Sequence, residues 1–133
     1  MRLDNVRVLV VDDEPDSLLL MGKAFQARGA IVRAASSAAE GRRELESFSP
    51  DAIVSDIGMP DEDGYAFMRS LRAMPVAHAI PAIALTGYAY PEDAQMAIEA
   101  GFNRHMIKPV NLQALLQNVH ELVNASSADD TKP

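Results

Sequence analysis

The chain has 133 residues, which suits one ordinary globular domain and leaves little room for a second. Hydrophobic residues make up 48% and charged residues 23% of it, close to the averages of soluble domains, which excludes a wholly disordered chain, a collagen and a coiled coil. The formal net charge of −7 argues against non-specific nucleic-acid binding, and the absence of cysteine excludes disulfides and thiolate chemistry.

Two further features concern the compartment. No apolar run approaches the ~20 residues of a membrane span. The N-terminal apolar stretch at 8–11 is too short for a signal peptide and runs directly into Asp12 and Asp13. We therefore expect a soluble cytoplasmic protein that binds neither membranes nor nucleic acid directly.

Short runs rich in Val and Ile alternate with longer stretches whose apolar residues recur three and four positions apart, which predicts alternating strands and amphipathic helices. In chain order we expect a strand at 6–11, a helix at 15–28, a strand at 31–35, a helix at 38–48, a strand at 52–55, a turn at 58–64, a helix from there to about 74, a strand at 82–85, a helix at 91–100, a strand at 104–107 and a helix at 111–123. Pro15 suits the first helical position, Gly29 and Gly101 suit helix ends, and Asn111 suits an N-cap.

This alternation predicts the fold class. Continuous apolar strands that alternate with helices imply a parallel sheet with helices on both faces. Five units are too few for an eight-stranded barrel, so we predict an α/β doubly wound open parallel sheet of order 2-1-3-4-5, the flavodoxin-like arrangement. We expect residues 1–124 to form this domain and residues 125–133 to be a flexible tail or a linker remnant.

Polar residues follow four of the five expected strands. Asp12 and Asp13 follow the first strand, Asp56 the third, Thr86 the fourth and Lys108 the fifth. In open parallel sheets the ligand site lies outside the carboxyl ends of the strands, near the point where the strand order reverses. We therefore expect these side chains to meet at one edge of the sheet.

Three carboxylates at one edge repel each other, so a cation is expected to neutralise them. Oxygen ligands without His or Cys favour Mg²⁺, which also binds phosphate oxygens. A carboxylate, a divalent cation, an ammonium and a hydroxyl together suit the binding of a phosphoryl group. A carboxylate can also accept that group and become an aspartyl phosphate.

These residues resemble the receiver domains of two-component response regulators, the family of the chemotaxis response regulator, over about 6–123. The matching segments are Asp12-Asp13-Glu14-Pro15, Asp56 with the following Gly58-Met59-Pro60, Gly64, Thr86-Gly87 and Lys108-Pro109. Each motif is weak alone, and their combination in order is specific. The stretch at 80–87 resembles receivers attached to hybrid histidine kinases, so we expect either a stand-alone receiver or one cut from such a kinase.

The resemblance implies a phosphorylation switch in a His-Asp phosphorelay. It implies that Asp56 accepts a phosphoryl group from the phosphohistidine of a histidine kinase or a histidine phosphotransfer protein. The implied Mg²⁺ ligands are Asp12, Asp13, Asp56 and the carbonyl of Gly58. Lys108 would pair with the phosphoryl oxygens, Thr86 would turn inward to them, and the Lys108–Pro109 peptide would be cis. Such a domain catalyses its own phosphorylation and dephosphorylation and is not an enzyme with a separate substrate.

Some details of this switch stay open. His105 stands where family members commonly carry Tyr or Phe, so it is either a half-exposed strand residue without a signalling role or a pH-sensitive switch ring that moves with Thr86. Gly58 leaves one side of the phosphoryl site open, whereas Tyr88 either shields the other side or is an exposed loop aromatic. The family places the output face on the fourth helix, fifth strand and fifth helix. Its partner is unknown, and a homodimer is one expectation.

Three other functions are compatible with a fold of this class, and the sequence fits two of them poorly. A flavodoxin-type electron carrier needs a Ser/Thr/Gly-rich phosphate loop after the first strand, where this chain has the acidic segment 12–16. An aspartate-based phosphohydrolase places its nucleophile and acid two residues apart in a pattern that this segment does not fit. The alternative that stays is a receiver-like interaction module that works without phosphorylation, against which the full acceptor, metal and lysine set argues.

Overall fold

The chain folds into strands and helices that alternate as the sequence predicts. The strands are β1 (Arg7–Val11), β2 (Ile31–Ala35), β3 (Ala52–Asp56), β4 (Ala82–Thr86) and β5 (Arg104–Ile107). The helices are α1 (Pro15–Gln26), α2 (Ala38–Phe48), α3 (Gly64–Arg72), α4 (Pro91–Ala100) and α5 (Leu112–Asp130). The computed structural model describes residues 1–87 and 90–130.

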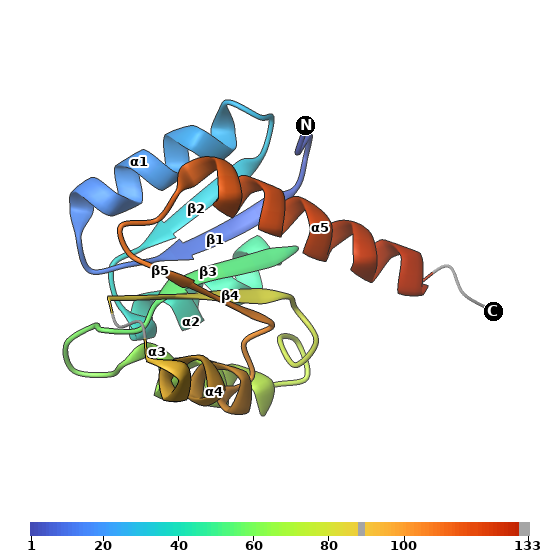
Figure 1. Cartoon of the computed structure of the whole chain (residues 1–133). Helices are drawn as coiled ribbons and strands as arrows, with labels where there is room; N and C mark the ends of the chain where they lie inside the picture. Colours follow the sequence, from blue (N-terminus) through green and yellow to red (C-terminus); the bar gives the residue numbers. More distant parts are fainter. Residues whose placement is uncertain (88–89, 131–133) are drawn as a thin grey trace.

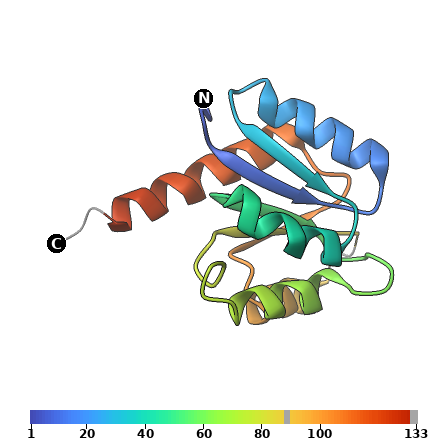
Figure 2. The same cartoon turned by 180° about the vertical axis from the view of Figure 1, so that it is seen from behind.

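All strand pairs are parallel, and the sheet has the order β2-β1-β3-β4-β5. Figure 1 shows α1 and α5 on one face of this sheet and α2, α3 and α4 on the other, and Figure 2 shows the second face from behind. The predicted doubly wound fold is therefore confirmed. The order reverses between β1 and β3, so the carboxyl ends of these neighbouring strands border one crevice.

The side-chain alternation of β1 explains the two layers. Leu9 and Val11 belong to the core beneath α2, α3 and α4, whereas Val8 and Val10 belong to the core beneath α1 and α5. All four side chains are fully buried. A strand covered on both faces needs apolar residues at every position, which is why the continuous apolar run predicts a central strand.

Local polar contacts define where helices begin. The Ser37 hydroxyl accepts a hydrogen bond from the Glu40 N–H at 3.1 Å and begins α2. The Asp63 carboxylate accepts one from the Ala66 N–H at 2.8 Å and begins α3. At the end of α4, Gly101 adopts a φ of 117°, a left-handed conformation in which a side chain is strained.

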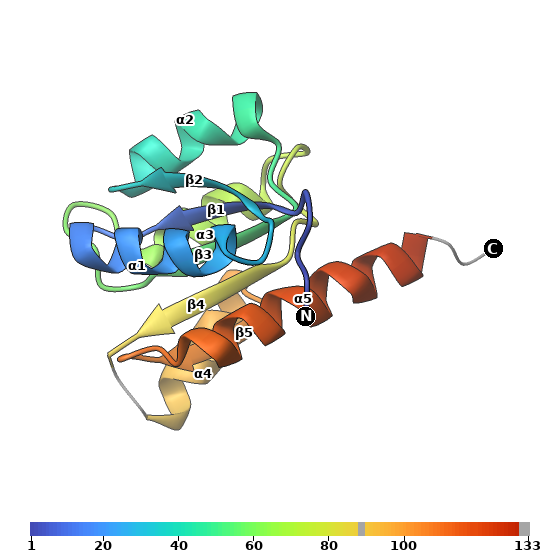
Figure 3. The same ribbon diagram turned by 90° about the horizontal axis from the view of Figure 1, so that it is seen from above.

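Helix ends differ from the predictions. α1 ends at Gln26 and α3 at Arg72, each slightly earlier than expected. In contrast, α5 continues to Asp130, so the expected helix end near 123 is wrong, because the stretch 124–130 contains no Gly or Pro to stop a helix. Figure 3 shows this last part of α5 extending beyond the sheet. Among the described residues no helix, α5 included, combines the length and apolar character of a membrane span.

Candidate functional site

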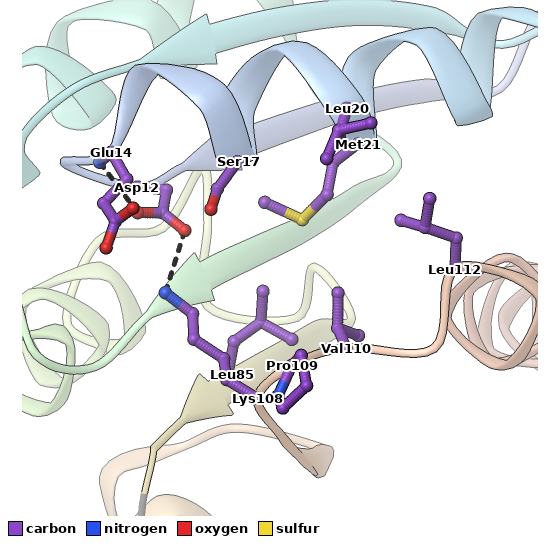
Figure 4. Close-up of a pocket in the computed structure, with 10 residues that line it drawn as sticks. All are labelled: Asp12, Glu14, Ser17, Leu20, Met21, Leu85, Lys108, Pro109, Val110 and Leu112. Carbon is purple, nitrogen blue, oxygen red and sulfur yellow. Dashed lines mark hydrogen bonds and ion pairs between the residues drawn. The ribbon is translucent and has the colours of Figure 1, made fainter.

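The structure brings four predicted side chains together at the carboxyl edge of the sheet. Asp12 directly follows β1, Asp56 and Thr86 end β3 and β4, and Lys108 directly follows β5. The Lys108 ammonium lies 3.1 Å from Asp12 Oδ2 and 3.2 Å from Asp56 Oδ1 (Figure 4 shows the first contact). The Asp12 side chain is 0% exposed, so this ion pair joins two strand ends within the protein rather than on its surface.

Backbone hydrogen bonds fix these side chains from several strands. The Asp12 carboxylate accepts a hydrogen bond from the Glu14 N–H at 2.9 Å, and the Asp12 N–H donates to the Ala35 carbonyl of β2 at 3.1 Å. The Lys108 N–H donates to the Thr86 carbonyl at 2.7 Å. The Lys108–Pro109 peptide is cis, as the resemblance implies.

Three carboxylates form the candidate metal site. Asp12, Asp13 and Asp56 each offer one oxygen, and these oxygens all lie within 4.8 Å of one another. Asp13 is more exposed than the other two. Gly58 lies beside them, because its N–H donates to Asp56 Oδ1 at 3.3 Å. A set of carboxylate oxygens open on one side fits Mg²⁺, which prefers oxygen ligands and keeps several waters.

Burial and neighbouring charges shift the pKa values of Asp56 and Lys108. Burial raises the pKa of Asp56, and the charge of Asp12 raises it further, while Lys108 acts in the opposite sense. Burial by itself lowers the pKa of Lys108, but the hydrogen bonds and charges of Asp12 and Asp56 together raise that pKa above its usual value. The lysine is therefore cationic at neutral pH, and ionising Asp56 costs more free energy in the folded protein than in the unfolded chain.

This cost predicts a pH-dependent stability effect of Asp56→Asn. Because the folded-state pKa of Asp56 is raised, the ionised group destabilises the fold at neutral pH, and the penalty disappears as the pH falls below the aspartate pKa of the unfolded chain. We expect the metal-free variant to melt above the parent at about pH 7, with the gap narrowing toward about pH 4. Thermal unfolding of both proteins in chelator across this pH range measures the difference in melting temperature. A parent that melts above the variant at every pH contradicts the prediction.

Thr86 and His105 lie on the strands where the sequence predicts them. The Thr86 side chain is buried at the end of β4. His105 lies on β5 opposite Ala84, and its Nε2 atom is buried without a hydrogen-bond partner among the described residues. Its role as a switch ring stays a prediction. No described atom lies within 4 Å of a Cβ placed on Gly58, which agrees with an open side, whereas Tyr88 lies outside the described residues.

An apolar groove next to the site was not predicted. It has a volume of about 470 Å³, runs between α1 and the start of α5, and has Asp12 and Lys108 at one end. Figure 4 shows its apolar lining, formed by Leu20, Met21, Leu85, Pro109, Val110 and Leu112. The Leu20 side chain is 59% exposed although it is apolar. The sequence carries no signal for this groove beyond the presence of Leu20, because its exposure depends on how α1 packs against α5.

A second unpredicted contact involves the acidic turn. The sequence predicts only a turn at 58–64 that leads into a helix. Asp63 does begin α3, but Glu62 pairs with Arg42 of α2. No local pattern reveals this pair, because the two residues belong to separate elements.

Known proteins resemble this chain over most of its length. The sequence profile of the response regulator receiver domain matches residues 8–120. An uncharacterised 14.6 kDa protein of Leptolyngbya boryana is 39% identical over 127 residues, which cover 96% of this chain and 97% of that protein. The transcriptional regulatory protein PrrA of Mycobacterium leprae is 35% identical over 125 residues, but these cover 94% of this chain and only 53% of PrrA.

The fold is shared with solved structures. A CheY-like response regulator receiver domain protein from Methanospirillum hungatei superposes with a TM-score of 0.87 at 26% identity. The match covers 95% of this chain and 99% of that structure. The likeness therefore extends over the whole sheet and its helices.

Proposed function

The chain belongs to the response regulator receiver family, and from this membership we propose that it is a phosphorylation switch in which Asp56 accepts a phosphoryl group. The donor is the phosphohistidine of a histidine kinase or a histidine phosphotransfer protein. The observation that carries the proposal is the Lys108 ammonium between the buried carboxylates of Asp12 and Asp56. The proposal places the protein in the cytoplasm.

The residues support a simple displacement. An Asp56 oxygen forms the new bond to phosphorus while the N–P bond of the phosphohistidine breaks, and the electron pair of that bond stays on the imidazole. Lys108, already 3.2 Å from Asp56 Oδ1, donates to the phosphoryl oxygens. Asp12, Asp13, Asp56 and the Gly58 carbonyl would hold Mg²⁺, which would supply positive charge to neutralise those oxygens. The chain acts on itself and on no separate substrate.

The phosphoryl group then biases two arrangements of the chain. Its negative charge draws in the Lys108 ammonium and the Thr86 hydroxyl, and the backbones of these residues are already hydrogen-bonded. The change alters the face formed by α4, β5 and α5. Met96, Ile98 and Ile107 are exposed on these elements, which supports a partner or a second copy of the chain binding there.

The groove beside the site supports a docking place for the donor. A phosphohistidine protein must bring its imidazole close to Asp56, and the groove between α1 and α5 ends at Asp12 and Lys108. Its apolar lining offers contact area, while the acceptor and the lysine stay at the edge. Acetyl phosphate, a small donor, needs no such surface.

We expect Leu20→Ser to slow phosphoryl transfer from a phosphorylated histidine phosphotransfer protein about tenfold, which corresponds to ~1.4 kcal/mol of lost contact. Phosphorylation by acetyl phosphate should be unchanged. Val76→Ser is the matched control, because Val76 is also exposed but precedes β4, at the opposite edge of the sheet. Transfer rates measured by phosphoprotein gel provide the test. A parent that takes no phosphoryl group from any histidine protein contradicts the proposed function, and equal rates for parent and variant contradict only the docking place.

A further inference from the structure

A clamp joins α2 to the loop that carries Gly58. Arg42 of α2 pairs with Glu62 through both guanidinium nitrogens, with Nη1 2.8 Å from Oε2 and Nη2 in contact with Oε1. The same Nη1 donates to the Ser70 hydroxyl of α3 at 2.9 Å. The guanidinium also lies over the Phe67 ring, 5.8 Å from its centroid. The arginine therefore contacts the loop and α3 at once, which restricts it more than a single surface ion pair would.

The loop at 57–63 is held by backbone hydrogen bonds, including one from the Glu62 N–H to the Pro60 carbonyl at 2.8 Å, and the Arg42 contact is added to these at its tip. Its ends are held by the Ile57 N–H, which donates to the Leu85 carbonyl at 2.9 Å, and by the Gly64 N–H, which donates to the Ile57 carbonyl at 2.9 Å. Between these ends Asp61 adopts a φ of 68°, a left-handed conformation that Asp and Asn enter more readily than other residues with a side chain. Glu62 follows directly, so its pairing with Arg42 ties this turn to α2.

We propose that Arg42 is a positioning residue for the Mg²⁺ site. By holding Glu62, it fixes the loop tip and with it the direction of the Gly58 carbonyl relative to Asp12 and Asp56. The inference rests on the proposed function, because it takes these carboxylates and the Gly58 carbonyl as the metal ligands. Arg42 is no ligand itself and acts only through the loop. Partners outside the ligand set of other metal sites act in the same way.

Charge and geometry predict opposite effects of one substitution. Arg42→Gln removes a positive charge near an acidic site, so Coulomb attraction alone would tighten Mg²⁺ binding. Loss of the clamp would weaken binding, because the loop tip is released. Arg42→Lys keeps the charge but loses the two-pronged contact, and Glu62→Gln loses the contact from the other side. The sign of the change in Kd for Arg42→Gln therefore separates the two explanations.

The test is calorimetric titration of MgCl₂ into the metal-free full chain. We expect the Mg²⁺ Kd to rise about tenfold in Arg42→Gln, Arg42→Lys and Glu62→Gln. Arg33→Gln is the control, because Arg33 pairs with Glu44 and so ties β2 to α2 without touching the loop. Its Kd should equal that of the parent.

Hydrogen exchange provides a second readout that does not depend on the metal. We expect amide exchange at 58–63 to accelerate in the metal-free forms of Arg42→Gln, Arg42→Lys and Glu62→Gln. Exchange in the strands of the sheet should be unchanged. A Kd for Arg42→Gln equal to or tighter than that of the parent overturns the inference, and so does unchanged exchange in the loop. A parent that binds no Mg²⁺ overturns the proposed metal site itself, whereas normal parent binding with unaffected variants overturns the clamp alone.

Discussion

Gly64→Ala is expected to lower the free energy of unfolding by about 3 kcal/mol and the melting temperature by roughly 10 °C. A Cβ on Gly64 would lie 2.4 Å from the carbonyl oxygen of Asp56 and 2.8 Å from the Ile57 Cα. Both atoms belong to backbone, so no side-chain rotation relieves the clash. The strand end that carries the acceptor must move, and the hydrogen bond between the Gly64 N–H and the Ile57 carbonyl is disturbed with it.

The matched control is Gly58→Ala in the same loop. No described atom lies within 4 Å of a Cβ at this position, so the free energy of unfolding should change by no more than about 0.5 kcal/mol. Chemical denaturation of both variants measures the difference. If Gly64→Ala were as stable as Gly58→Ala, the close packing of α3 against the acceptor strand would be contradicted.

The second large effect is the loss of phosphoryl uptake in Asp56→Asn. The amide keeps the shape of the side chain but offers no carboxylate oxygen to form an acyl phosphate. Asp12 cannot replace it readily, because its carboxylate is fully buried and already accepts hydrogen bonds from Lys108 and the Glu14 N–H. We therefore expect Asp56→Asn to lose phosphoryl uptake completely, rather than to take up the group at a lower rate.

The sheet and the site edge were accessible from the sequence for one physical reason. Strands buried on both faces form continuous apolar runs, as β1 does from Val8 to Val11, so their carboxyl ends are easy to locate. In a parallel sheet those ends share one edge, which places Asp12, Asp56, Thr86 and Lys108 together without any knowledge of the loops. The strand at 31–35 and the helix at 38–48 were located with the same bounds that the structure has.

What the sequence could not show depends on contacts between separate elements. The apolar pattern of α1 does not show which of its leucines are buried: Leu19 is 57% exposed, because the helix buries only a stripe that contains Met21 and Phe25. The pair between Arg42 and Glu62 depends on the conformation of a loop, and no spacing rule predicts it. The groove beside Leu20 likewise requires the packing of α1 against α5 to be known.

The most direct measurement is intact mass after incubation with acetyl phosphate and Mg²⁺, for the parent and for Asp56→Asn. We expect the parent to gain the mass of one phosphoryl group, and we expect no gain in the variant or in the parent treated with chelator. A gain that persists in Asp56→Asn would contradict the assignment of the acceptor. A parent that gains nothing from acetyl phosphate or from a phosphorylated histidine protein would contradict the switch and favour an interaction module that works without phosphorylation.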